Sequence, residues 1–79
     1  MGNMPLTFLN IGEKGIVESI NGSDNISKRL YEMGINRGSN IEIVKNDFGP
    51  LIVSLTGSRI AISKGLAQKI LITKKWGGI

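Results

Sequence analysis

The sequence predicts one small, mainly β domain with an inserted helix, arranged as a closed or nearly closed barrel of four or five short strands. The chain of 79 residues has the size of a single domain. Short runs rich in Ile, Leu and Val alternate with Gly- and Asn-rich turn clusters, which is typical of short strands joined by tight turns. One segment alone has apolar residues at helical spacing. Barrel closure is favoured because it removes exposed edges that so thin a sheet could not otherwise protect.

The first elements are a lead-in segment and a strand. Residues 5–9 are expected at a sheet edge, because Pro5 has no N–H to donate to a central ladder. Turn signals at 10–15 and 21–22 bracket residues 16–20, a short run rich in β-branched side chains. We therefore predict the first full strand there.

A helix of about ten residues follows. Ser23 or Asp24 can cap its first turn by accepting hydrogen bonds from free backbone N–H groups. Its apolar stripe consists of Ile26, Leu30 and Met33. Gly34 is expected to end the helix, because glycine adopts positive φ without steric cost. The stripe predicts that the helix closes one open end of the barrel.

The rest of the chain is predicted to be mainly strands. They are expected at 41–45, 51–55, 59–63 and 69–73, with a turn at 46–50, a hairpin turn at 56–58 and a single helical turn at 63–68. Ile41 and Ile43 should point inward and Glu42 outward. The chain 1–79 is thus one domain, with its core at about 6–73 and a C-terminal tail at 74–79.

The composition argues against catalysis and against a metal site. The chain has neither His nor Cys, so the commonest general base, the commonest metal ligand and the thiol nucleophile are all missing. The six acidic residues are dispersed along the chain. We therefore expect no enzyme activity, no catalytic residue, no cofactor and no metal ligand. A divalent-cation site made of carboxylates alone is the remaining metal alternative.

Charge and hydropathy bear on partners and location. The net charge is +4, and no acidic residue follows Asp47, so a basic face from the C-terminal half is expected. The alternative is a solvated surface that happens to be basic. No apolar run approaches the roughly 20 residues that span a bilayer, and the N-terminus makes a poor signal peptide. We expect a cytoplasmic protein without membrane insertion.

Gly34 and Gly38 enclose Arg37, which raises the question of a phosphate-binding loop. Such a loop precedes a helix, because phosphate binds at the positive N-terminal end of the helix. Here the helix comes first and presents its carbonyl end, which repels phosphate. The two glycines are therefore predicted to be the connection between a helix and a strand.

The run Arg29-Leu30-Tyr31-Glu32-Met33-Gly34-Ile35, followed by Gly38 and the strand at 41–44, resembles the FeoA family of small proteins associated with bacterial ferrous iron transport. The likeness continues through Gly49-Pro50-Leu51, Gly57 and Ala67, and covers residues 6–72. It implies an SH3-like barrel with one inserted helix. It also implies a cytosolic accessory protein that acts on FeoB, the membrane permease whose cytoplasmic part is a GTP-binding domain.

Six residues are candidates for partner contact. Arg29, Tyr31 and Glu32 lie off the apolar stripe of the helix. Arg37, where the family often has Pro, lies on a predicted loop, and loops on rigid scaffolds commonly carry binding. Lys75 and Trp76 follow the last strand, where Trp76 is either an interface anchor or a side chain folded back on the barrel.

The alternative function is a small, basic, SH3-like nucleic-acid-binding domain. Base stacking usually needs aromatic residues interleaved with basic ones. This chain has one Trp, one Tyr and two Phe, widely scattered, so protein interaction is favoured and a nucleic-acid partner is not expected. The sequence leaves open the docking face, the direction of the effect on the transporter and the oligomeric state.

Overall fold

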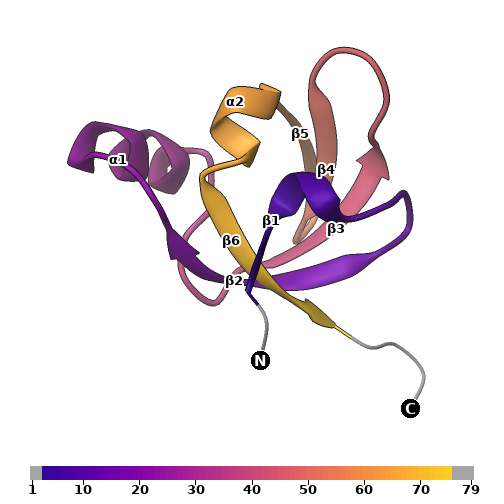
Figure 1. Cartoon of the computed structure of the whole chain (residues 1–79), viewed down its shortest axis with the longest axis horizontal. Coiled ribbons are helices and arrows are strands. Elements are labelled where there is room, and N and C mark those ends of the chain that lie inside the picture. The colour runs from indigo at the N-terminus through magenta and orange to yellow at the C-terminus, as the bar shows by residue number, and fades with distance from the viewer. Residues whose placement is uncertain (1–2, 76–79) are drawn as a thin grey trace.

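The computed structural model describes residues 3–75, and the side chains as far as residue 74. The elements, in chain order, are β1 (Met4–Pro5), the 3-10 helix η1 (Leu6–Phe8), β2 (Lys14–Ile20), α1 (Asp24–Glu32), β3 (Asn40–Lys45), β4 (Leu51–Leu55), β5 (Ser58–Ile62), α2 (Lys64–Ala67) and β6 (Ile70–Lys75). The strands form one sheet in the order β1-β6-β2-β3-β4-β5, with every pair antiparallel. Figure 1 shows the sheet curving around a small interior.

The mainly β fold with one inserted helix is confirmed, but the sheet has six strands and is open. Its end strands, β1 and β5, do not pair with each other within residues 3–75. The sixth strand is β1, in which Met4 pairs with Ile72 and Pro5 with Leu71 of β6. Pairing stops there because the chain turns into η1. Pro5 thus lies on an edge strand, as its missing N–H predicts.

The core is aliphatic, and no polar or charged residue is buried among those the structure describes. Ile41 and Ile43 of β3 are buried while Glu42 between them is partly exposed, which confirms the predicted alternation. Thirteen buried residues make one cluster: Leu6, Leu9, Val17, Leu30, Ile35, Ile41, Ile43, Leu51, Val53, Ile62, Ala67, Ile70 and Ile72. Burial of this apolar surface is the main favourable contribution to folding.

Helix α1 stands at one end of the molecule, as Figure 1 shows. The Ser23 hydroxyl caps it by accepting from the backbone N–H of Ile26 at 3.4 Å. Leu30 is completely buried, whereas Ile26 and Met33 are half-buried and pack against the core. The predicted stripe therefore attaches α1 to the barrel, and the rest of the helix surface faces outward.

Two strands extend two residues past a predicted end. β2 begins at Lys14 and β6 continues through Lys74 and Lys75, because Lys14 pairs with Lys75 and Gly15 with Lys74. The close approach depends on Gly15, since a Cβ at this position would lie 3.0 Å from Cδ1 of Ile72. The predicted single helical turn is confirmed as α2.

Candidate interaction surface

The segment that connects α1 to β3 is held by a Schellman motif. Gly34, at φ +90°, donates its N–H to the Tyr31 carbonyl at 2.9 Å, and Ile35 donates to the Leu30 carbonyl at 2.8 Å. Leu30 and Ile35 are both fully buried, which provides the hydrophobic contact that usually accompanies this motif. The end of α1 is therefore fixed to the core.

Ser39 fixes the remainder of this loop. Its hydroxyl accepts from the Asn36 N–H at 3.0 Å and lies 3.3 Å from the Gly34 carbonyl. The backbone is also tied to β2, because Gly38 donates to the Val17 carbonyl at 2.8 Å and Val17 donates to the Ser39 carbonyl at 2.9 Å. Arg37 is thus exposed on a loop whose backbone is fixed on both sides.

This geometry confirms that the glycine pair is a helix-to-strand connection. The loop follows the carbonyl end of α1, which is the negative pole of the helix. Gly34 and Gly38 both adopt positive φ, of +90° and +93°, where a side chain would be strained. Nothing in this arrangement points backbone N–H groups from a helix N-terminus toward a phosphate.

Four of the six predicted contact residues belong to α1 and the loop that follows it. Arg29, Glu32 and Arg37 are exposed, and Tyr31 exposes 66% of its surface. Within residues 3–75, none of them forms an ion pair. We call these four residues the α1 face, although Arg29 and Tyr31, two positions apart on the helix, point to different sides of it. Of the other two, Lys75 ends β6, while its side chain and all of Trp76 lie outside the described residues.

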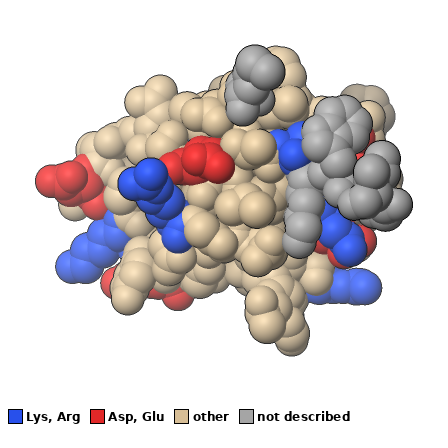
Figure 2. All heavy atoms as spheres, turned by 90° about the horizontal axis from the view of Figure 1, so that it is seen from below, with Lys and Arg blue, Asp and Glu red and all other residues tan. Residues whose placement is uncertain are grey.

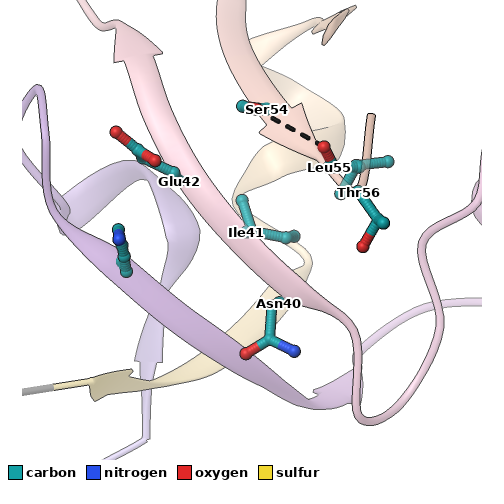
Figure 3. Close-up of a pocket in the computed structure, with 7 residues that line it drawn as sticks. Asn40, Ile41, Glu42, Ser54, Leu55 and Thr56 are labelled. Atoms are coloured by element: carbon teal, nitrogen blue, oxygen red, sulfur yellow. Dashed lines mark hydrogen bonds between the residues drawn. The ribbon is translucent and has the colours of Figure 1, made fainter. Parts of the chain in front are cut away.

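A groove opens beside the α1 face. It consists of two hollows of about 240 Å³ and about 340 Å³, which share Asn40, Leu55 and Thr56. The first, drawn in Figure 3, is also lined by Lys14, Ile41, Glu42 and Ser54. The second is also lined by Met33, Gly34, Gly38, Ser39 and Ser58. The predicted connection at Gly34 and Gly38 is therefore one wall of this β3–β4 groove.

The lining of the β3–β4 groove suits hydrogen bonding better than catalysis. Glu42 lies opposite Lys14 of β2 and Ser54 of β4 in the strand register. The groove is thus lined by one carboxylate, one ammonium group, several hydroxyls and an amide, together with apolar side chains such as Leu55. No three acidic, His or Cys side chains in the described part of the chain come together as a metal site. Sequence reasoning missed this groove, although the polar, outward-facing residues of β3 and β4 were a signal.

Two basic residues of the C-terminal half lie beside acidic residues, so the charge around them is mixed. Lys74 forms an ion pair with Glu13, and the Lys64 ammonium group donates to the Asp47 carbonyl, so these basic residues lie beside acidic residues from earlier in the chain. Figure 2 shows blue and red side chains interspersed on one face. The reason is the antiparallel pairing of β6 with β2, which brings the two halves together.

Among the side chains of residues 3–74, Glu13 alone has a clearly shifted pKa. Its carboxylate accepts from the Asn10 backbone N–H at 2.7 Å and pairs with Lys74. These contacts, the Asn10 hydrogen bond first, lower the pKa of Glu13 below its ordinary value. The pair joins the loop before β2 to the end of β6.

Comparison with known proteins identifies the family. The FeoA domain profile matches residues 4–74, which is nearly the whole chain. The chain belongs to the FeoA domain family. A protein of Methanocaldococcus jannaschii, described as a candidate Fe(2+) transport protein A, is 44% identical over 75 residues, covering 94% of this chain and 92% of its own.

Solved FeoA structures share the fold. A crystal structure of an iron uptake regulatory protein (FeoA) has a TM-score of 0.88 and 37% identity, covering 95% of this chain and all of its own. The zinc complex of Stenotrophomonas maltophilia FeoA has a TM-score of 0.77 and 26% identity, covering 89% of each chain. The latter is described as an SH3 domain protein and a candidate ferrous iron transport activating factor.

The FeoA domain described here is thus SH3-like and belongs to a family associated with ferrous iron transport. The expected family and fold are confirmed. Nowhere in residues 3–75 is a helix long and apolar enough to cross a bilayer.

Proposed function

We propose that this protein is a noncatalytic, cytoplasmic accessory protein of ferrous iron uptake. It docks on the cytoplasmic GTP-binding domain of a FeoB-type transporter and modulates that domain. Family membership supports the iron-transport context. The absence of His and Cys from the sequence supports a role through contact rather than chemistry.

The observation that carries the proposal is the exposed and rigid α1 face. A tyrosine and two arginines are residue types enriched at the energetic centres of protein interfaces. Tyr31 is 66% exposed although it lies one residue from the fully buried Leu30. Because the Schellman motif fixes this end of the helix, docking there costs little conformational entropy.

The β3–β4 groove extends the same surface. It begins at Met33 and Gly34, directly after α1, and continues past Asn40 to Glu42 and Lys14. Its hydroxyls and amide can pair with backbone groups of a bound segment. The α1 face would supply the anchoring side chains, and the groove would supply hydrogen bonds to an extended part of the partner.

Binding to the isolated GTP-binding domain tests this proposal. The dissociation constant would be measured at moderate salt for the wild-type protein and for Tyr31→Ser, Arg37→Ser and the matched control Phe48→Ser. Phe48 is an exposed aromatic residue on the β3–β4 turn, at the other end of the molecule (Figure 1). We expect the Tyr31 variant to bind at least about tenfold more weakly and the control to bind normally.

The same titration separates docking on the transporter domain from the alternative nucleic-acid-binding function. GTP hydrolysis by the domain should change when the wild-type protein is added, and should not change with Tyr31→Ser. Equal binding by all variants would refute the α1 face as the docking site. Binding to an RNA oligonucleotide instead, with an affinity that falls steeply with salt, would favour the nucleic-acid function.

A further inference from the structure

Three large apolar side chains are exposed on neighbouring segments at the end of the molecule away from α1. Phe8 exposes 68% of its surface, Ile11 63% and Phe48 98%. We call these three residues the apolar tip. Phe8 belongs to η1, Ile11 to the loop before β2, and Phe48 to the β3–β4 turn. None of them contributes to the core cluster, so their exposure is not explained by folding.

Hydrogen bonds hold these segments together. The Asn46 side chain donates to the carbonyls of Thr7, at 3.3 Å, and Leu9, at 2.7 Å, on either side of Phe8. Gly12, next to Ile11, donates to the Ile43 carbonyl at 2.8 Å. The β3–β4 turn and the segment before β2 therefore form one fixed end of the molecule, seen in Figure 1 on the side opposite α1.

The backbone around Phe8 keeps its side chain outside. Leu6 and Leu9 are buried at 0% and 1% exposure, and they occupy the inward positions of this segment. Phe48 lies at the tip of a turn and is almost completely exposed. All three side chains of the apolar tip are therefore mostly exposed to solvent.

Size and shape favour a bilayer over a protein partner for the apolar tip. A phenylalanine offers roughly 150–250 Å² of surface, so the three residues together offer about 400 Å². A standard protein interface buries about 800 Å² per partner and needs a complementary surface. A bilayer interface needs neither, because binding there scales with the apolar area inserted and with attraction to anionic lipids.

Two lysines and one aspartate lie beside the apolar tip. Lys45 ends β3 just before the turn and forms an exposed ion pair with Asp47 at 4.0 Å, and the Lys64 ammonium group donates to the Asp47 carbonyl beside Phe48. The chain as a whole carries a net charge of +4. Lysine side chains near an apolar insertion can extend their ammonium groups to lipid phosphates. The net positive charge of the chain is thus complementary to an anionic membrane surface, and beside the tip Lys45 and Lys64 outnumber the one carboxylate of Asp47.

We infer that Phe8, Ile11 and Phe48 insert into the interface of an anionic bilayer and hold the protein reversibly at the membrane surface. This goes beyond the proposed function, which concerns α1 at the other end. It also departs from the sequence-based expectation of no membrane insertion, because three exposed apolar side chains on neighbouring segments were not predicted. The two ends are compatible, because a protein held by the apolar tip leaves the α1 face free.

Cosedimentation with vesicles tests the inference. The wild-type protein, Phe8→Ser/Phe48→Ser and the matched control Tyr31→Ser would be mixed with vesicles of phosphatidylcholine alone or with 30% phosphatidylglycerol, about 30 mol% being a strongly anionic surface. We expect the wild type and Tyr31→Ser to bind the anionic vesicles. The double variant should partition at least about tenfold less, because it loses the insertion of two aromatic side chains.

Three results would overturn the inference. They are failure of the wild type to bind anionic vesicles, undiminished binding of the double variant, and loss of transporter-domain binding in the double variant with vesicle binding intact. Unchanged thermal unfolding of the double variant verifies that it is folded. Since Tyr31→Ser tests docking and the double variant tests membrane binding, failure of one proposal is distinguishable from failure of the other.

Discussion

Leu30 connects the candidate docking helix to the core of the molecule. It has no exposed surface, whereas its neighbours Arg29 and Tyr31 are exposed. One residue thus fixes the orientation of the side chains on either side of it. The packing of Leu30 contributes to stability, and the exposure of Arg29 and Tyr31 makes these two side chains available for binding. The two roles can be separated by substitution.

The substitution Leu30→Ala should lower the free energy of unfolding by about 2–5 kcal/mol, through lost burial and the cavity left behind. Urea denaturation measures this change. Lys28→Ala, an exposed position on the same helix, should stay within about 0.5 kcal/mol of the wild type. Equal losses in the two variants would mean that Leu30 is not a core residue.

Glu13 gives stability a pH dependence in the acidic range. Because the folded state lowers its pKa below the ordinary 4.5, its contribution is present above pH 4.5 and is lost as pH falls through the folded pKa. Glu13→Gln should therefore show a flatter decline of stability below pH 4.5 than the wild type. The difference would be measured from the urea midpoints of both proteins across pH 2.5–6, which covers roughly two pH units on either side of the carboxylate pKa.

Lys74→Gln provides the companion test. The Asn10 hydrogen bond is the larger cause of the shift, and it remains in this variant. The pH dependence due to Glu13 should thus shrink without disappearing. If the pH dependence due to Glu13 disappeared completely in Lys74→Gln, the ion pair with Lys74 would be the main cause of the lowered pKa of Glu13.

At the scale of elements, the C-terminal end of α1 sets the position of the helix relative to the β3–β4 groove. Gly34 occupies positive φ, and its neighbours close the Schellman motif. The sequence was sufficient to predict this helix and its end, because the apolar spacing and the glycine both act locally. Strands β3 and β4 were predictable for the same reason, from alternation that places Ile41, Ile43, Leu51 and Val53 inward.

Other features could not be predicted because they depend on pairing between distant segments. β1 is a strand through its contact with β6, and the extension of β6 exists because Lys74 and Lys75 meet the start of β2. The β3–β4 groove requires the register of three strands. The apolar tip requires the Asn46 side chain to join two loops. Local sequence patterns contain none of this information.

Gly34→Ala should destabilise the protein by about 1–2 kcal/mol, because Ala is strained at a φ of +90°. A Cβ there would meet only an ordinary contact, 3.5 Å from Cδ1 of Leu55, so strain and not a clash is the cause. Gly65→Ala is the matched control: its Cβ would enter open space in α2, and the change should be neutral or stabilising. Thermal unfolding distinguishes the two, and equal midpoints would contradict the account.

At the scale of the whole molecule, two exposed surfaces lie at opposite ends of the long axis (Figure 1). The α1 face and the β3–β4 groove form one surface, and the apolar tip forms the other. The small barrel between them fixes their relative orientation. Taken together, the two proposals place the α1 face beside a partner that is itself anchored in a membrane.

The central claim is that the α1 face docks on the GTP-binding domain of the transporter. An NMR titration of the isotope-labelled protein with the unlabelled domain tests it most directly. The account predicts saturable shifts in the backbone signals from Arg29 to Arg37 and along Asn40 and Thr56, with those of Phe8 and Phe48 unchanged. Saturable shifts confined to the Phe8 and Phe48 end, or no shifts at all, would contradict it.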